Sequence, residues 1–400
     1  MAMLWPYYSR TPMNALLAHS VRWGIGDEQT RQLLSAYDDG KVFAGQAWDG
    51  IFNELREGVT SAPSSERTGI SHGNSTLIWI CTGIAFRLID HLGICFDSQR
   101  YMGSVTLFDE DTEIRHRLFW SCYFWDKLTS LYLGRSPSLQ QSPASPPQRI
   151  LDDSAEDELW TPYGLTYANG GQYPPTPSHS TSSFIQICRL TVIFNEILIH
   201  MYDPTNHNSD TEMHSCLVKE EASLNSWWAE LPSFLKMDIS DLARYAPPSH
   251  IVIQNLLYYC FRILFYRPML SRRSSPEFGH LEPNPNHLRE RVSSATAIIA
   301  IFDLYHRTFG ESHCMISVAY CVLHQVIIKR PVGWSSAHAL ARASRINPVI
   351  RSALKLVMEA INDLGVERTM PFEPQPVTGT PPSTSTRYPL QSQAFTSWND

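Results

Sequence analysis

Residues Glu113–Leu139 read EIRHRLFWSCYFWDKLTSLYLGRSPSL, and this stretch decides the fold. Large apolar side chains fall on nearly every face of the helix that it predicts, so neighbours must cover that helix on several sides. Acidic residues at 109–113 occupy its first turn, where the helix dipole favours negative charge, and Gly134 and Pro137 end it. Apolar packing does not explain the carboxylate of Asp126 in its middle.

Helical spacing recurs along the rest of the chain. Apolar residues return at steps of three and four over 74–93, 183–201, 212–231, 251–266, 292–310, 315–328 and 347–365. Short alternating runs, which are typical of strands, do not repeat in this pattern. We therefore expect an all-α fold, with a single large helical domain of seven or more helices.

Composition divides the chain into parts. Glycines punctuate residues 1–70, which we expect to be a poorly organised N-terminal segment with short helices at most. Residues 71–370 form the helical body, and residues 136–182 within it are rich in Ser, Pro, Thr and Gly, which predicts a long flexible insertion. The tail at 371–400 has a similar composition and is expected to be disordered.

The charge and the cysteines limit the classes of function. The formal net charge is −7 at pH 7, whereas proteins that hold DNA by charge are usually basic. Tight DNA binding by this chain alone is therefore not expected. Eight cysteines without a Cys-x-x-Cys pair favour a reducing compartment. The most apolar run, 251–270, is interrupted by polar residues, so no membrane partner is expected.

The stretch at 113–139 resembles the signature helix of the fungal-specific transcription factor domain, the regulatory middle region of binuclear zinc-cluster transcription factors. The family pattern is a basic-Arg-Leu-Phe-Trp run, an Asp–basic pair, and then Gly-Arg-Pro-Pro. The chain matches this pattern at Arg117, Leu118, Phe119, Trp120, Asp126, Lys127, Gly134, Arg135 and Pro137. It departs at Ser136, where proline is usual, and at Lys127, where arginine is usual.

Three further segments resemble helices of the same family, in the family's order. STLIWICTGIAFRLIDHLGI carries Arg87, LNSWWAELPSFL carries Trp228 and Pro232, and LLYYCFRILFYRPML ends in the pair Arg267-Pro268. Four matches in the correct order make the resemblance specific over about residues 70–330.

The resemblance implies a nuclear regulator of genes transcribed by RNA polymerase II, and not an enzyme. Its partners would be the transcription machinery or other regulators, with a small-molecule effector and a homodimer as further expectations. The family's zinc cluster normally precedes this domain, but the first cysteine here is Cys81, inside a predicted helix. We therefore expect no zinc or other cofactor in this chain, and DNA contact only through a missing module or a partner. Either the chain is a truncated factor, or it is a stand-alone regulatory domain.

The charges of the opening stretch have an architectural interpretation. An unpaired buried carboxylate is very costly, and Asp126 stands among large apolar residues. We expect it to pair with Arg87 on the preceding helix or with Arg135 after the turn, and we expect the ring of Trp120 to be buried. For Arg115 and His116 a solvated turn is as good an interpretation as a buried contact.

Two other functions have some support in the sequence. Asp152-Asp153-x-x-Glu156 resembles the aspartate-rich magnesium motif of all-α terpenoid synthases, but it lies in a Ser/Pro-rich segment and no second motif accompanies it. A small-molecule-sensing adaptor without DNA contact is the other alternative, because 11 Trp, 17 Tyr and 17 Phe could line a pocket as well as a core. Cys321 and His324, one turn apart, are better explained as two buried helix residues than as zinc ligands.

Overall fold

The structure, a computed structural model, describes residues 10–24, 28–57, 75–97, 108–150, 152–162, 173–202, 210–271 and 285–310. Its helices in these ranges are α1 (Arg10–Gly24), α2 (Glu28–Ser35), α3 (Lys41–Glu57), α5 (Ser75–His91), α7 (Asp109–Leu133), α8 (Ser180–Ile197), α9 (Asp210–Glu230), α10 (Ser249–Ser271) and α11 (Pro285–Phe309). Short helical turns are η1 (Asp38–Gly40), η2 (Leu198–Tyr202) and η3 (Ser233–Leu235), of which η2 continues α8. The strands described in this part of the chain, β1 (Leu159–Trp160) and β2 (Thr176–Pro177), pair antiparallel. The expected all-α class is confirmed.

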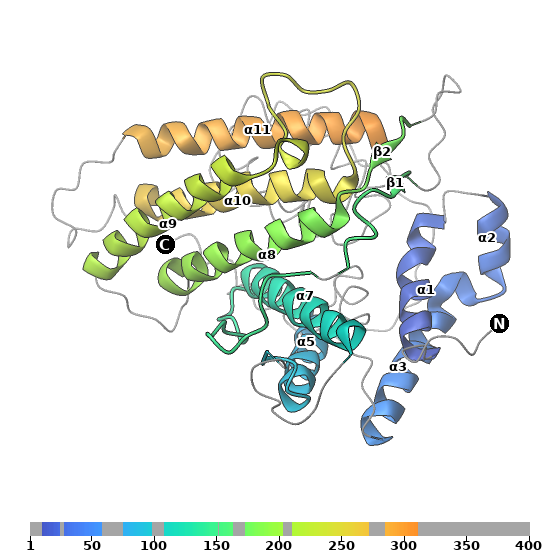
Figure 1. Cartoon of the computed structure of the whole chain (residues 1–400). Helices are drawn as coiled ribbons and strands as arrows, with labels where there is room; N and C mark the ends of the chain where they lie inside the picture. Colours follow the sequence, from blue (N-terminus) through green and yellow to red (C-terminus); the bar gives the residue numbers. More distant parts are fainter. Residues whose placement is uncertain are drawn as a thin grey trace, which may run out of the picture.

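The helices from α5 to α11 form one continuous body (Figure 1). In it α11 packs on α10, α10 on α8, α8 on α7 and α7 on α5, while α9 lies against α8. Helices α1 and α3 pack mainly on each other, at the side of this body (Figure 1). The body therefore consists of successive helical layers, with α8 in the middle.

The larger of two hydrophobic clusters surrounds α10, as its all-round apolar sequence predicts. The ring of Phe261 on α10 stacks on Phe194 of α8 with centroids 3.7 Å apart. Two of the polar residues that interrupt the apolar run have these partners: Ser183 of α8 donates to Gln254, and Asn255 bonds the backbone of the loop that follows α9. Buried polar side chains thus join α10 to its neighbours in register.

The second cluster lies between α5 and α7 and includes Phe86, Phe119, Trp120 and Tyr123. Helix α8 belongs to both clusters, since its Cys188 joins this one while its later turns join the larger one. The segment formed by α8 and η2 is long and apolar enough to cross a membrane. Because it contacts α7, α9 and α10, we interpret it as a core helix.

Glycine ends the helices where the sequence predicts. Gly134 after α7 has φ 62° and Gly93 after α5 has φ 63°, the left-handed conformation that closes many helices. The N–H of Gly134 donates to the carbonyl of Ser130, which satisfies one of the last carbonyls of α7. This turn directs the chain back along the side of α7.

Residues 10–57 are more helical than expected for a poorly organised segment. Gly50 lies inside α3, and Thr11 of α1 occupies the space where a Cβ of residue 50 would stand. The glycine therefore permits close packing of two helices. The helices expected at 315–328 and 347–365 and the tail at 371–400 lie outside the described residues.

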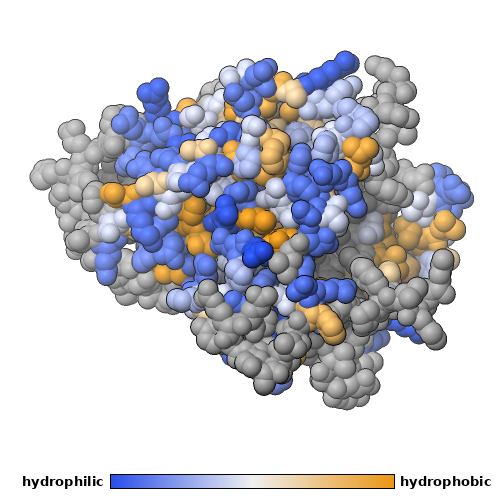
Figure 2. All heavy atoms as spheres, viewed as in Figure 1, coloured by the Kyte–Doolittle hydropathy of each residue, from blue (hydrophilic) through white to orange (hydrophobic). Residues whose placement is uncertain are grey.

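The face of the molecule in Figure 2 is mostly hydrophilic, with apolar atoms between charged ones. Among the described residues, exposed large apolar side chains occur on the N-terminal helices, where Leu33 is 66% exposed. The helical body buries most of its apolar residues in the two clusters, but it also exposes some, such as Phe108 (81%) and Val218 (61%).

The buried tyrosines of α10 predict instability in alkali. Burial raises the pKa of Tyr259 from its ordinary value of 10.0 to about 12, because the phenolate would lose its water. Burial likewise raises the pKa of Tyr258 and Tyr266. The folded state keeps protons that the unfolded state releases, so stability that is fully present below pH 10 is lost as pH rises toward 12.

Denaturant unfolding across this pH window should show a falling midpoint, and the tyrosinate absorbance of these three buried tyrosines should appear only as the protein unfolds. Tyrosinate signal from all tyrosines near pH 10 at unchanged stability would show that these rings are not buried.

Candidate functional site

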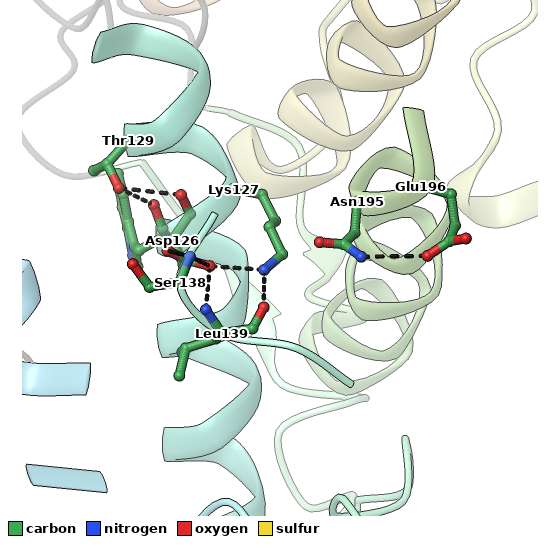
Figure 3. A network of polar contacts seen from close by, with 8 residues as sticks. Asp126, Lys127, Thr129, Ser138, Leu139, Asn195 and Glu196 are labelled. Carbon is green, nitrogen blue, oxygen red and sulfur yellow. Dashed lines mark hydrogen bonds and ion pairs between the residues drawn. The ribbon is translucent and has the colours of Figure 1, made fainter. Parts of the chain in front are cut away.

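The carboxylate of Asp126 is the polar centre of α7. Its Oδ1 accepts the backbone N–H of Ser138 at 3.0 Å, and its Oδ2 accepts the N–H of Leu139 at 2.9 Å. The ammonium of Lys127 donates to Oδ2 at 2.7 Å and also to the carbonyl of Leu139. Figure 3 shows how these groups point toward one another. We call these four residues, Asp126, Lys127, Ser138 and Leu139, the Asp126 clamp.

The clamp is almost completely withdrawn from water. The side chain of Asp126 is 1% exposed and that of Lys127 is 0% exposed. The Lys127 ammonium also lies 4.1 Å from the ring centroid of Tyr123. Burial lowers the pKa of Lys127, and the adjacent carboxylate opposes that effect. Each charge in the pair thus depends on the other and on the backbone of residues 138–139.

The clamp holds the chain that leaves α7 against the helices. We call residues 134–150 the strap. Besides the clamp, the indole N–H of Trp120 donates to the carbonyl of Pro147 at 3.1 Å. The N–H of Asp97, after α5, donates to the carbonyl of Ala144 at 2.7 Å. The strap is therefore anchored by α7 at both ends and by the end of α5 between them.

The described parts of residues 136–182 make defined hydrogen bonds to the rest of the fold, so they are not the flexible insertion that we expected. Beyond the strap, β1 and β2 pair with each other, and the hydroxyl of Tyr173 donates to the carbonyl of Ala246 at 2.7 Å. Ser- and Pro-rich composition does lower the tendency to form helices, but side chains of the neighbouring helices bond this backbone.

The partner expected for Asp126 is also wrong. Arg87 is exposed on α5, and the guanidinium of Arg135 lies 4.6 Å from the ring centroid of Trp79. Lys127 takes their place, although side chains at i and i+1 of a helix normally point in different directions. The long side chain of Lys127 makes this pairing feasible, together with two backbone N–H groups that share the negative charge.

The basic residues at the start of α7 make defined contacts. Arg115 donates to the carbonyl of Leu92 at 2.9 Å, and Arg117 pairs with Glu113 at 2.6 Å. His116 is 5% exposed, and neither ring nitrogen has a hydrogen-bond partner among the described residues. The solvated-turn interpretation of Arg115 and His116 is therefore wrong, and Arg115 joins α7 to the end of α5.

The other signature positions serve packing and turns. Trp120 is 1% exposed, as expected, and Leu118 packs against the smaller cluster. The ring of Trp228 stacks on Tyr258 with centroids 4.3 Å apart. Three more positions are placed as follows: Pro137 is half-buried in the strap, Pro232 stands before η3, and the half-buried pair Arg267-Pro268 lies within the last turns of α10. None of them converges on a catalytic centre.

A cavity of about 400 Å³ lies at the far end of the larger cluster. Its apolar lining includes Ile251 of α10 and Leu304 of α11. The loop after η3 adds two cationic and two anionic side chains, those of Lys236, Arg244, Asp238 and Asp241. Volumes of roughly 300–1,000 Å³ are typical of small-molecule sites, so a ligand with both charges would fit here.

The aspartate-rich motif does not form a metal site of the synthase kind. Asp152 and Asp153 are exposed in a turn, whereas that chemistry needs them on an apolar helix. Glu156 is engaged by His179 at 3.1 Å and by the N–H of Ser182 at 2.9 Å. The described ranges contain no group of three or more metal-ligating side chains, and Cys321 and His324 lie outside them.

Comparison with known proteins gives a family match over residues 66–231, to the fungal specific transcription factor domain. Similar proteins include nitrogen assimilation transcription factor nit-4 of Neurospora crassa, 26% identical over 62% of this chain and 22% of its own length. Nitrogen assimilation transcription factor nirA of Emericella nidulans is 27% identical over 60% of this chain and 26% of its own length.

The uncharacterized transcriptional regulatory protein C757.04 of Schizosaccharomyces pombe is 29% identical over 64% of this chain and 39% of its own length. The chain thus spans between 22% and 39% of the length of these three relatives. No solved structure matches this chain.

Replacing Asp126 by Asn should lower the free energy of unfolding by about 3–5 kcal/mol, because it leaves the Lys127 ammonium buried without its counter-charge. Denaturant unfolding measures this. The matched control is Asp303→Asn, which breaks an exposed ion pair with Arg307 and should cost about 0.5 kcal/mol or less.

A double variant shows whether the loss of stability comes from the unpaired Lys127 charge or from the changed side-chain shape. Asp126→Asn with Lys127→Met removes both charges and should be more stable than Asp126→Asn alone by at least about 1 kcal/mol. Equal losses in Asp126→Asn and in the surface control would disprove the clamp.

Proposed function

Because residues 66–231 match the fungal specific transcription factor domain, we propose that the chain belongs to this family and regulates transcription in the nucleus through its helical body. The observation that carries this proposal is the coincidence of the family match with α5, α7, the strap and α8. The Asp126 clamp joins two of these elements, α7 and the strap. The three relatives named above, each titled as a transcription factor or transcriptional regulator, support it.

The helical body would act by contact with other proteins. The buried Asp126 clamp holds the strap on α7, and the hydrogen bond from Arg115 to the carbonyl of Leu92 holds the end of α5 on α7. Together they would present a surface of fixed shape to a partner. With a net charge of −7, DNA contact would come from a partner or from the family's zinc cluster, where the zinc would also reside. We assign no catalytic step to this chain.

The physiological input that we propose is nitrogen supply. Two of the relatives are titled nitrogen assimilation transcription factors. The proposal concerns which genes are controlled, and it is separate from the proposal that the chain controls transcription.

Tethering tests the regulatory activity directly. The chain fused to an unrelated DNA-binding domain should change the output of a reporter gene in fungal cells, and Asp126→Asn should remove this change because the helical body loses its clamp. Asp303→Asn should behave as wild type. Reporter output is compared in nitrogen-rich and nitrogen-limited medium at equal protein abundance.

An abundant nuclear fusion protein that leaves the reporter unchanged in both media would contradict the regulatory proposal. A change that is the same in both media would contradict only the nitrogen input.

We propose, as a second function, that the cavity after η3 binds a small effector. The cavity volume and its paired charges favour a compact zwitterion. Such a ligand would contact α10 and α11 together with the loop at 236–247, and would stabilise the folded body by mass action.

Thermal unfolding with a panel of free L-amino acids as probes tests this. At least one should raise the Tm of the wild type but not that of Ala243→Trp, which adds an indole at a residue that lines the cavity. The control Ala222→Trp, at an exposed position of α9, should keep the response. No response to any zwitterion, or an equal response in Ala243→Trp, would contradict it.

A further inference from the structure

The strap contains three serines that are each followed by proline: Ser136-Pro137, Ser142-Pro143 and Ser145-Pro146. We propose that Ser142 is phosphorylated by a proline-directed protein kinase, and that the folded strap directs the kinase to Ser142 and away from Ser136 and Ser145. All three sites are Ser-Pro pairs, so a preference of the kinase for one of them must come from the fold.

Exposure separates the three sites. Ser142 and its proline, Pro143, are both exposed, and so are Gln140 and Gln141 before them. A kinase that reads Ser-Pro must accommodate the proline ring and several flanking residues in its cleft. At Ser142 the strap offers four consecutive exposed residues, 140–143, for that contact.

At Ser145-Pro146 the buried proline prevents access of a kinase. Pro146 is buried and Ser145 is half-buried. The next residue, Pro147, accepts the indole N–H of Trp120 through its carbonyl. Binding of Ser145 in a kinase cleft would require this end of the strap to leave α7, whereas Ser142 needs only a local change.

At Ser136-Pro137 the Asp126 clamp restricts access of a kinase. Ser136 and Pro137 are half-buried, and the next two residues, Ser138 and Leu139, are bonded through their N–H groups to the buried Asp126 carboxylate. Freeing this segment would leave that carboxylate and the Lys127 ammonium without backbone partners, which is costly in a dry site.

The bonds of Ser142 are local and few. Its Oγ accepts the N–H of Ala144 at 3.2 Å and lies 3.5 Å from the Oγ of Ser145. Its N–H donates to the Oγ of Ser145 at 3.0 Å. The N–H of Ser145 also donates to the carbonyl of Ser142 at 3.0 Å, so the bonds of Ser142 stay within one turn of the exposed strap. Opening this turn costs at most the bond from the Asp97 N–H to the Ala144 carbonyl, and the anchors at 138–139 and 147 remain.

The chemistry is an ordinary phosphoryl transfer from ATP. The Ser142 hydroxyl oxygen forms a bond to the γ-phosphorus of ATP, the bond from that phosphorus to the β–γ bridging oxygen breaks, and ADP leaves with the electron pair. The hydroxyl proton passes to the base of the kinase. The product adds about −1.5 to −2 charges to the exposed side of the strap, where an arginine-rich partner surface could bind it.

The test compares the folded chain with a peptide of the same sequence. The full chain and a synthetic peptide of residues 134–150 are treated with one purified proline-directed kinase and Mg-ATP. Mass spectrometry then gives the rate at each serine. The ratio of Ser142 to Ser145 phosphorylation should be higher in the folded chain by about tenfold or more, the factor expected if Ser145 requires about 1.4 kcal/mol of extra opening.

Two variants control the assignment. Ser142→Ala should remove most phosphate from the strap of the folded chain, and Ser145→Ala should retain it. Asp126→Asn, which frees the strap, should move the ratio toward that of the peptide. A ratio that is equal in chain and peptide, or a folded chain phosphorylated mainly at Ser145 or Ser136, would overturn the proposal.

Discussion

A carboxylate in the middle of an apolar helix has to be compensated where it lies, and the structure around α7 follows from how this is done for Asp126. Two backbone N–H groups and one ammonium converge on its oxygens. Because both N–H groups belong to the chain that leaves the helix, compensating the charge also fixes the path of that chain. A side chain that could be regarded as a defect of the core thus determines the position of the strap.

Burial of this kind contributes specificity more than stability. A hydrophobic pair of similar size would often be as stable. It would not select residues 138–139 as its partners, however, since apolar contacts have no direction. The hydrogen bonds of Asn255 to the loop after α9 and of Gln254 to Ser183 act in the same way. In each case a polar group in an apolar helix selects one particular partner, the backbone at 235–237 for Asn255 and the Ser183 side chain for Gln254.

Much of the fold was predictable because helix periodicity is a local property. The positions of α5, α7, α9, α10 and α11, and the stops at Gly93 and Gly134, follow from apolar spacing and from glycine. The burial of Asp126 was also predictable from its neighbours. Its partner was not, because Lys127 is adjacent in sequence and adjacent helix residues usually diverge.

The ordered strap and the N-terminal helices depend on contacts that composition does not show. Residues 134–150 have the composition of a loop, but Asp126, Trp120 and Asp97 bond their backbone. Glycine has a low helix propensity, but at position 50 the absence of a side chain leaves the space that Thr11 occupies. Both are tertiary effects that override local propensity.

Helix α8 packs in both hydrophobic clusters, with Cys188 in the smaller cluster and Phe194 in the larger one. Because α8 is rigid, a rotation that changes its packing in one cluster also changes its packing in the other. Any twist that eases the packing near α7 must disturb the stacked rings on α10, so the molecule has to repack everywhere at once or keep its present shape.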